Sequence, residues 1–403
     1  MTQEKSALAR VPGFRAVGVT CGLKKSGNPD LALVLGSNPC TAAAVFTTNV
    51  FKAAPVLYDM ALLEKVDTLR GVVINAGNAN AVTGQQGMRD AQQMARFTES
   101  FCDLPSDSIF VMSTGIIGEK MPMDTIEHGI KLAGEAIKTE AGECGENAAQ
   151  AIMTTDLVPK EAFAQVDLGG KMVSIGAMAK GSGMIHPNMG TMLSLIVTDA
   201  AIDADTLHVA LKQAVDASFH RVTVDGDTST NDTVAILASG LAGNASPAGA
   251  ELDAFVAALT DVCVQLAKAV ARDGEGATKL VEITVRGAAN PADAEAAAKT
   301  IATSPLMKTA LFGNDPNWGR ALAAIGRSGA QVNPAKVSLR LGDFLLVENG
   351  EPQKFDAAAA SQWLNSTAEV LLEADLGAGQ AEVTVWTCDL SYKYIEINAE
   401  YHT

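Results

Sequence analysis

The chain has 403 residues, of which 48% are hydrophobic and 19% charged, and its formal net charge at pH 7 is −16. This composition can bury a large core, which excludes an intrinsically disordered protein. The acidic excess repels phosphate backbones and argues against a nucleic-acid partner. Apolar runs fall short of the roughly 18 to 20 residues that span a bilayer, so no membrane association is expected. The six cysteines form no C-x-x-C pair and no secretory leader is visible, which indicates a cytoplasmic protein with reduced thiols.

Short runs rich in valine and isoleucine predict β-strands along the chain, and a Gly-Gly pair at 169–170 predicts a tight hairpin turn between two of them. Apolar residues spaced by threes and fours predict helices over 88–101 and 251–271. Stretches rich in alanine and glycine at 239–250 and 287–298 predict connecting segments. Strands interleaved with helices indicate a mixed α/β protein with helix-covered sheets. The predicted strands are 71–75, 109–112, 172–177, 192–197, 221–224, 280–285 and 337–341.

Several common site motifs are missing from the sequence. It contains no Walker-type phosphate loop, no G-x-S-x-G nucleophile elbow and no histidine spacing typical of zinc, so neither a cofactor nor a metal is expected. The segment DGDTSTND at 225–232 begins like a calcium loop. It has Thr230 at the sixth position and Ile236 at the twelfth, which favours a polar turn between two strands. His186 precedes a proline, which favours a loop-packing histidine over a catalytic base.

The stretch KGSGMIHPNMGTML, which starts at Lys180, leads from a glycine-rich loop into a predicted strand with Thr191 at the junction. If the chain breaks before Thr191, the freed α-amine has a pKa near ~7.7–8.0 and can accept the proton of the hydroxyl on the same residue. Gly190 leaves its carbonyl open to attack, and the β-branch of Thr191 restricts the rotation of the hydroxyl. Lys180 could favour negative charge nearby, or lower the pKa of the amine by like-charge repulsion. An ordinary loop-to-strand junction is the alternative interpretation.

Acyl transfer by such a nucleophile also needs hydrogen-bond donors for an oxyanion. Thr114 and Gly115 directly follow an apolar run that is predicted as a strand. A turn at a strand end leaves backbone N–H groups unpaired, and Thr114 adds a hydroxyl donor. The pair is therefore a candidate oxyanion hole, with a plain strand-ending turn as the alternative.

The stretch KGSGMIHPNMGTML resembles the autoprocessing motif of the ornithine acetyltransferases, also called the bifunctional glutamate N-acetyltransferases of arginine biosynthesis. The likeness runs over essentially the whole chain, with many separate segments in the family's order. These segments are PGFRAVGVTCGLKKSGNPDLALV, AAAVFTTNVFKAAPV, VVINAGNANAVTG, STGIIG, AIMTTDLVPK, DGDTSTNDT, RDGEGATKLVEI, NDPNWGR and INAEYHT.

The resemblance implies that the precursor cuts itself between Gly190 and Thr191 into an α chain, 1–190, and a β chain, 191–403, which assemble as an α2β2 heterotetramer. Thr191 would take the acetyl group of N-acetylornithine as an ester and pass it to glutamate, in ping-pong order and without a cofactor. Acetyl-CoA stays open as a second donor, because members of the family differ on this point. The family usually has alanine before its nucleophile. We expect cleavage with Gly190 as well, because glycine is sterically permissive.

The fold that the resemblance implies is a layered αββα sandwich, similar in layering to the N-terminal nucleophile hydrolases. Residues from 191 to about 240 would complete the central sheet, and about 241–403 would form a smaller C-terminal α/β subdomain and a docking tail. Lys180 can pair with a carboxylate of the substrate and Glu275 with an ammonium, and which group each holds stays open. The family's oxyanion pair falls on Thr114 and Gly115, and its substrate contacts fall on Thr154, Lys180, Thr191, Glu275, Asn398 and Thr403.

Two other function classes share parts of this interpretation. A hydrolase, either an amidase or an aminopeptidase, would use the same self-generated N-terminal threonine but pass the acyl group to water. Release of acetate without glutamate would indicate the hydrolase. A noncatalytic amino-acid binding protein would keep its cellular function when Thr191 is replaced by alanine.

Overall fold

The structure is a computed structural model that describes residues 5–186 and 192–400. Its larger sheet has eight strands in the order β4-β3-β2-β8-β7-β6-β5, with β1 paired to β2. The strands are β1 (Phe14–Val19), β2 (Leu31–Phe46), β3 (Thr68–Asn78), β4 (Ile109–Ile116), β5 (Lys160–Leu168), β6 (Lys171–Lys180), β7 (Leu193–Thr198) and β8 (Thr233–Ala238).

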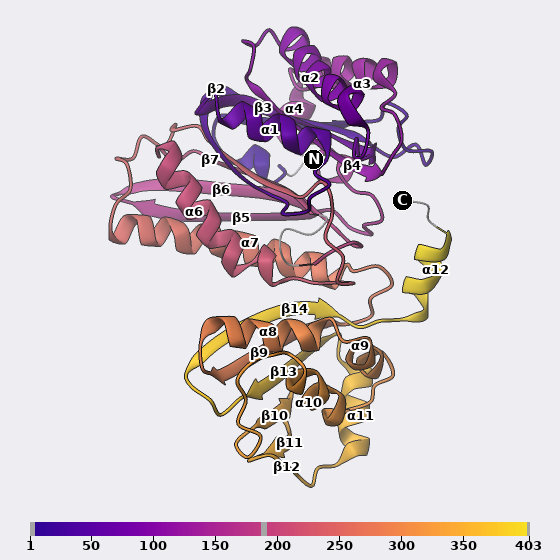
Figure 1. Ribbon diagram of the computed structural model, residues 1–403. Helices are drawn as coiled ribbons and strands as arrows, with labels where there is room; N and C mark the ends of the chain where they lie inside the picture. Colours follow the sequence, from indigo (N-terminus) through magenta and orange to yellow (C-terminus); the bar gives the residue numbers. More distant parts are fainter. Residues whose placement is uncertain (1–4, 187–191, 401–403) are drawn as a thin grey trace.

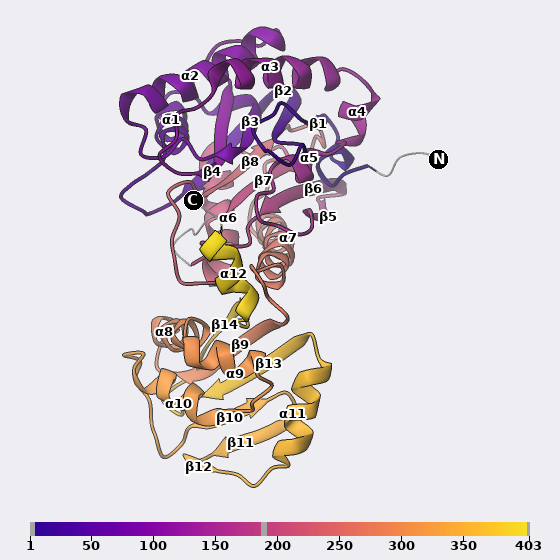
Figure 2. The same cartoon turned by 90° about the vertical axis from the view of Figure 1, so that its right-hand side faces the viewer.

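Strand β2 passes from one half of this sheet into the other. Its first part pairs with β1 and β3, and the part from Thr41 onward pairs with β8. The register with β3 shifts between Leu35 and Cys40, a break that lets a long strand bend. The sheet therefore folds over into two leaves, one of β1, β3 and β4 and one of β5 to β8 (Figures 1 and 2).

Side chains on the two faces of each leaf enter different cores, as the two-residue period of a strand requires. Val72 and Ile74 of β3 face the other leaf and pack in one cluster with Leu195 of β7. Val73 faces outward and packs against helices. The two leaves of the sheet pack face to face, and a layer of helices covers the outer face of each leaf. This arrangement confirms the predicted αββα sandwich (Figure 1). The helical segments of this unit are η1 (Leu8–Arg10), α1 (Ala54–Leu63), α2 (Gly84–Phe101), α3 (Met123–Ala136), α4 (Glu140–Cys144), α5 (Ala148–Ala151), α6 (Ala204–Ala217), η2 (Phe219–Arg221) and α7 (Ala250–Arg272).

A smaller six-stranded sheet with its own core follows α7, in the order β12-β11-β10-β13-β9-β14. The sequence-based boundary near 241 assigns α7 to this unit, but α7 packs on β5 and β6 of the larger sheet. The elements of the smaller unit are β9 (Leu280–Ala288), α8 (Pro291–Ala302), α9 (Pro305–Phe312), α10 (Trp318–Gly326), β10 (Ser338–Leu341), β11 (Phe344–Glu348), β12 (Glu351–Pro352), α11 (Ala357–Ser366), β13 (Glu369–Asp375) and β14 (Ala381–Cys388). The last helix, α12 (Tyr392–Glu400), returns from β14 toward the larger unit (Figures 1 and 2).

Two of the predicted elements are wrong, and both errors have a local cause. The expected strand at 221–224 is the end of η2 followed by a single bridge from Val222 to Trp386, because no neighbouring strand runs beside it for longer. The expected connecting segment at 287–298 contains most of α8. There the Asn290 side chain caps the helix by accepting from the Asp293 N–H at 2.9 Å, which outweighs the glycine and alanine content. The hairpin predicted at 169–170 is confirmed, with Leu168 paired to Lys171.

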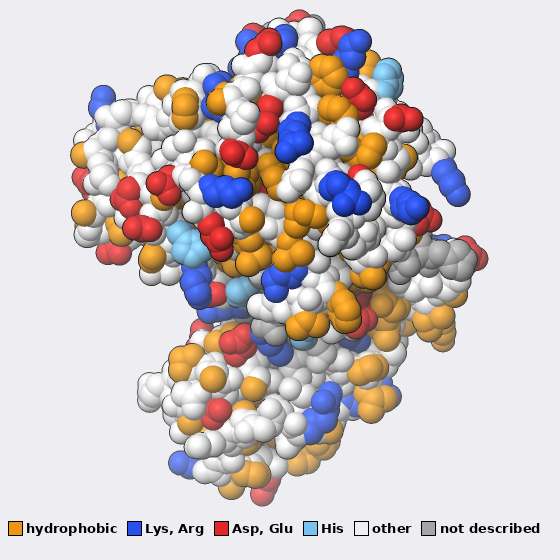
Figure 3. Space-filling model, turned by 45° about the horizontal axis from the view of Figure 1, so that its top comes forward, with side chains coloured by type: hydrophobic (Ala, Val, Ile, Leu, Met, Phe, Trp, Pro, Cys, Tyr) orange, Lys and Arg blue, Asp and Glu red, His pale blue; other side chains and the backbone are white. Residues whose placement is uncertain are grey.

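Helix α7 is long and apolar enough to cross a membrane by length and composition. Its apolar side, including Leu259 and Leu266, is buried on the larger sheet, as in the core helix of a soluble protein. Figure 3 shows acidic and basic side chains intermixed over the face in view, not gathered in one patch. All six cysteines are unpaired, and four of them are buried.

Candidate active site

A cavity of about 260 Å³ lies at the ends of β4 and β6, beside the start of β9 and under α12. Six of the residues predicted from the sequence line it, although they are spread from β4 to the end of the chain. Gly190, Thr191 and Thr403 lie outside the described residues. The lining residues that were predicted are Thr114, Gly115, Thr154, Lys180, Glu275 and Asn398.

Gly115 occupies a position that no other residue can fill without displacing backbone. Its φ is +133°, and a Cβ built on it would lie 2.3 Å from the carbonyl carbon of Gly77 and 2.5 Å from the nitrogen of Asn78. Strand β4 therefore lies against the end of β3 here, and this contact fixes the direction of the Thr114–Gly115 peptide. Real Cβ atoms do not approach backbone this closely, so the site requires glycine.

Buried amide side chains hold the end of β4 from behind. Asn231 donates from Nδ2 to the carbonyl of Ser113 at 2.8 Å and to that of Ala79 at 2.7 Å. The Ser113 hydroxyl donates to Oδ1 of Asn75 at 2.5 Å. Because buried polar networks of this kind are rigid when every member is paired, Thr114 is presented on a fixed support.

Lys180 is the basic group of the cavity, and its residue is only 2% exposed. Its Nζ donates to Oγ1 of Thr154 at 2.7 Å and to Oγ1 of Thr114 at 3.4 Å. An ammonium has no acceptor, so both hydroxyls accept from it and keep their own protons free to donate elsewhere. The arrangement makes Thr114 and Thr154 donors toward whatever occupies the cavity. That is the chemistry an oxyanion or a carboxylate requires.

Carboxylates line the other side of the cavity. Glu275 lies directly over Gly183, where an added Cβ would come within 2.4 Å of its Cδ. Asp225 accepts from the N–H groups of Met184 at 2.6 Å and Ile185 at 3.0 Å, and burial raises the pKa of Asp225 to about 6. Asp227 adds a third acid to the lining. The described lining residues therefore present one ammonium and several carboxylates, which suits a ligand that carries both charges.

Helix α12 completes the cavity from the C-terminal side. Asn398 donates from Nδ2 to Oε2 of Glu275 at 2.7 Å, and Tyr394 also lines the cavity. Ser391 fixes the start of the helix by donating from its hydroxyl to the carbonyl of Gly276 at 2.6 Å. No described residue of α12 is buried, so these few polar contacts place the helix rather than a packed core.

Strand β7 begins directly after the predicted nucleophile, between β6 and β8. The N–H of Met192 donates to Oδ1 of Asp232 at 2.9 Å, while Oδ2 of Asp232 is buried without a hydrogen-bond partner among residues 5–186 and 192–400. Burial raises the pKa of Asp232 well above its usual range, although the Met192 N–H and the charge of Lys180 oppose this shift. The buried carboxyl of Asp232, with its raised pKa, thus lies next to the start of β7.

Sequence reasoning missed several residues of the cavity. The segment 225–232, interpreted from the sequence as a polar turn, supplies its acidic side and Ser229. The sequence signal that could have found these residues was the density of acidic and hydroxyl side chains immediately before β8. Because β8 lies parallel to β7, the segment before β8 starts at the same edge of the sheet as the segment before β7. The remaining missed lining residues are Ile117, Thr155, Gly183, Met184 and Tyr394.

His186 and possible metal ligands do not contribute to this cavity. The Nδ1 of His186 lies 3.2 Å from the Thr223 hydroxyl, and burial lowers the pKa of the imidazole. Within residues 5–186 and 192–400, no three His, Cys, Asp or Glu side chains are grouped to hold a metal ion.

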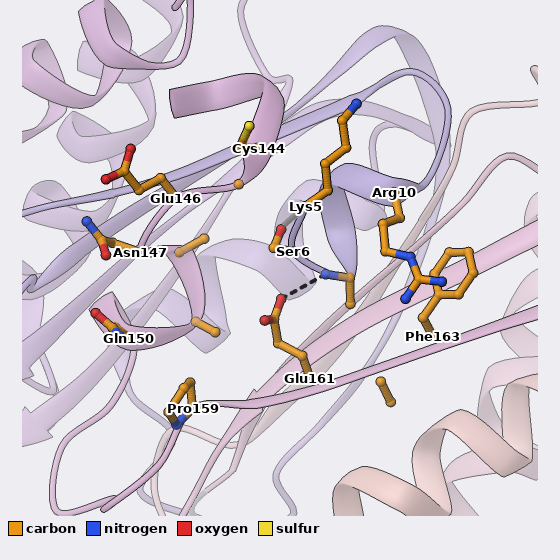
Figure 4. A pocket seen from close by; sticks show the side chains of 15 residues that line it. Lys5, Ser6, Arg10, Cys144, Glu146, Asn147, Gln150, Pro159, Glu161 and Phe163 are labelled. Carbon is orange, nitrogen blue, oxygen red and sulfur yellow. Dashed lines mark hydrogen bonds between the residues drawn. The ribbon is translucent and has the colours of Figure 1, made fainter. Parts of the chain in front are cut away.

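A second cavity, of about 440 Å³, lies between η1, α5 and the start of β5 (Figure 4). Glu161 accepts there from the N–H of Ala7 at 2.9 Å, and the Arg10 guanidinium lies 3.6 Å from the ring centroid of Phe163. Glu161 and Arg10 thus bind other groups of the protein, and the predicted site residues that the structure describes line the cavity of about 260 Å³. We therefore take the cavity of about 260 Å³ as the candidate active site.

Comparisons with known proteins match this chain over nearly its whole length. The ArgJ family model matches residues 15–403. The arginine biosynthesis bifunctional protein ArgJ of Symbiobacterium thermophilum is 52% identical over 395 residues, which cover 97% of each chain. The protein of the same name from Synechococcus sp. is 49% identical over 403 residues, covering 97% of this chain and 96% of that one. The crystal structure of Mycobacterium tuberculosis ornithine acetyltransferase complexed with ornithine is 36% identical and covers 45% of this chain and 94% of that one, with a TM-score of 0.39.

The four-layer sandwich and its mixed-charge cavity define the class of protein, which is an α/β protein with a site suited to a small molecule that carries both charges. The match over nearly the whole chain, with half of its residues identical to a curated relative, identifies the family. The chain belongs to the ArgJ family of arginine-biosynthesis enzymes.

Proposed function

We propose that the enzyme moves the acetyl group of N2-acetyl-L-ornithine to L-glutamate through an acetyl ester on Thr191. The observation that carries this proposal is the cavity itself, in which the charged and hydroxyl groups needed for such substrates converge beside the start of β7. Membership of the ArgJ family supports the same chemistry. The volume of about 260 Å³ is close to the lower limit for small-molecule sites and suits an amino acid.

The first half-reaction transfers the acetyl group to the enzyme. The Thr191 hydroxyl attacks the acetyl carbonyl while the free α-amine of the same residue takes the hydroxyl proton. The resulting oxyanion is positioned for the Thr114 hydroxyl and the N–H of Gly115. The C–N bond then breaks, the α-nitrogen of ornithine receives the proton, and ornithine leaves.

The second half-reaction runs the same steps in reverse order with a new acceptor. The neutral α-amine of glutamate attacks the ester carbonyl, the proton passes back through the Thr191 amine, and the hydroxyl is released. Ornithine and glutamate have similar backbones but opposite side-chain charges. A cavity with Lys180 on one side and Glu275 and Asp225 on the other can pair with groups of either sign.

Self-cleavage between Gly190 and Thr191 is part of the proposal, because an internal threonine has an amide nitrogen that cannot serve as a base. The cut would give an α chain, 1–190, and a β chain, 191–403. Strand pairing supports their staying together, since β6 of the first and β7 of the second are adjacent in one sheet. We further propose an α2β2 assembly in the cytoplasm.

A donor comparison tests the function directly. Purified enzyme is supplied with N-acetylornithine or acetyl-CoA carrying a labelled acetyl group, with and without glutamate. Label should pass from N-acetylornithine to glutamate and, without glutamate, should remain on the β chain as a stable ester. Transfer from acetyl-CoA would add a second donor, whereas rapid release of labelled acetate without glutamate would identify a hydrolase instead.

Replacing Asn398 with alanine should raise the KM for N-acetylornithine by roughly tenfold. A hydrogen bond to a charged group contributes about 1.5–3 kcal/mol, and this one should lie at the lower end of that range because helix α12 is exposed. The Asn398 amide holds the Glu275 carboxylate in place. Steady-state kinetics provide the measurement. Lys393→Ala on the same helix removes a surface ion pair with Glu396 and should leave KM unchanged. Equal effects of the two variants would contradict a specific role for Asn398.

A further inference from the structure

We propose that Asp156, which does not line the cavity, is a positioning residue that keeps Lys180 ionised and directed at Thr114 and Thr154. The inference rests on the proposed function and adds a residue to which neither the sequence motifs nor the resemblance gave a role. Its basis is a buried cluster of two lysines and two aspartates behind the cavity.

The Asp156 carboxylate ties together the segments that form this side of the cavity. Its Oδ1 accepts from Nζ of Lys160 and from the N–H of Gly181, each at 2.7 Å. Its Oδ2 accepts from the N–H of Thr154 at 2.9 Å and lies 3.9 Å from Nζ of Lys180. One side chain therefore fixes the open end of the β5–β6 hairpin and the segment that carries Thr154.

The charges in this cluster balance only when Asp156 is present. Lys160 has a second carboxylate partner, because its Nζ also lies 2.6 Å from Oδ2 of Asp273. Lys180 has a single carboxylate partner, because among the described residues its one ion pair within 4.0 Å is the contact with Asp156. The side chains of Lys160, Lys180 and Asp156 are at most 2% exposed. Without Asp156, two buried ammonium groups would share one carboxylate.

The protonation of Lys180 follows from these surroundings. Burial lowers its pKa, and the negative charge of Asp156 is the largest influence that opposes this. Among the other charged groups that face Lys180, Glu275 and Asp232 raise its pKa, whereas Lys160 lowers it; the positive charge of Lys24 also lies near. A buried lysine that loses its partner releases its proton instead of staying charged.

The same contacts determine the state of Asp156. Although burial opposes it, the charges of Lys180 and Lys160 lower the pKa of Asp156, so the carboxylate stays ionised at every pH at which the enzyme would work. Asp156 is therefore a permanent negative charge beside Lys180. A neutral Lys180 could not form an ion pair with a substrate carboxylate, and its lone pair could accept a threonine proton that would otherwise point into the cavity.

The test compares the pH dependence of Asp156→Asn with that of the unchanged enzyme. The readout is kcat/KM for ornithine release from N-acetylornithine by the cleaved protein between pH 6 and 10. Loss of a nearby opposite charge changes a pKa by about 1–3 units, so the alkaline limit of activity should move down by that amount. An unchanged limit would overturn the inference.

Asp273→Asn is the matched control. It removes a carboxylate from the same buried cluster but from Lys160, not from Lys180. It should lower the melting temperature as Asp156→Asn does and leave the alkaline limit within a few tenths of a pH unit. Equal shifts in both variants would mean that the effect is not specific to the contact between Asp156 and Lys180, which would also overturn the inference.

If Asp156→Asn alone does not fold, the double variant Lys160→Met with Asp156→Asn provides the same test, because it removes one charge of each sign. It should shift the alkaline limit in the same direction but by less, because Lys160 itself lowers the pKa of Lys180. The unchanged enzyme separates this inference from the proposed function. If it releases no ornithine, the function is wrong, whereas an active enzyme with no shift in the variants contradicts the role of Asp156 alone.

Discussion

Replacing Thr191 with alanine should abolish acetyl transfer, with kcat/KM falling by at least ~10⁴-fold, as expected when a covalent nucleophile is removed. The variant has neither the hydroxyl that carries the acetyl group nor the group that attacks the preceding peptide bond. It should therefore also remain a single chain of 41.7 kDa. Gel electrophoresis and the labelled-acetyl assay measure the two effects in one preparation.

Thr191→Ser is the matched control for this prediction. Serine keeps the hydroxyl and, after cleavage, the α-amine, while it lacks the methyl group that restricts rotation. We expect it to cleave more slowly and to retain measurable transfer. An alanine variant that transfers acetyl groups at the rate of the unchanged enzyme would show that Thr191 is not the nucleophile.

Gly115→Ala should lower kcat by roughly 10²–10³-fold, the effect of losing one oxyanion donor. The new Cβ would lie 2.3 Å from the backbone of Gly77, so the end of β4 must move away from β3 and carry the N–H of residue 115 with it. Single-turnover kinetics of ornithine release isolate this step. Substrate binding should change less than the chemical step, because Lys180 lies at the end of β6 and Glu275 lies in the loop between α7 and β9.

Gly118→Ala separates the clash from backbone strain. Gly118 also has a positive φ, +84°, but a Cβ there meets nothing within 4 Å. Its replacement should cost about 1 kcal/mol of stability and leave kcat near its original value. An equal loss of kcat in Gly118→Ala and Gly115→Ala would show that catalysis does not depend on the position of the Thr114–Gly115 peptide.

The fold was predictable wherever the periodicity of the sequence reflects burial. Helix α7 and strands such as β3 and β9 carry clear apolar patterns, and the structure places them close to the expected bounds. The four-layer arrangement was implied by the resemblance. Periodicity does not reveal that β2 bends and pairs with both leaves, because pairing partners far apart in the chain leave no local pattern.

In the smaller unit, the composition of the sequence concealed a helix. Helix α8 consists largely of alanine, which has a high helix propensity but little hydrophobic contrast, so it resembled a connecting segment. Helix α7 was assigned to the wrong side of the boundary for a related reason. Its apolar stripe shows that it packs against something but does not show which sheet it covers.

For the cavity, the sequence alone supplied the junction at Thr191 with Lys180 near it, and the turn at Thr114 and Gly115. The positions of Thr154, Glu275 and Asn398 came from the resemblance, and the structure brings these three and Lys180 to one cavity. Asp225, Tyr394 and Asp156 were missed. Their roles depend on contacts across the fold, such as the one between Asp225 and the N–H groups that follow Gly183, which no spacing in the chain indicates.

Intact-mass spectrometry of fully active enzyme, combined with N-terminal sequencing, tests most directly the claim that the catalyst is a threonine at a new chain end. The account predicts two polypeptides, the second of which begins at Thr191, and a gain of one acetyl group on that second chain when N-acetylornithine is added without glutamate. Full activity in material whose 403-residue chain is uncut, or an acetyl group found on the first chain, would contradict it.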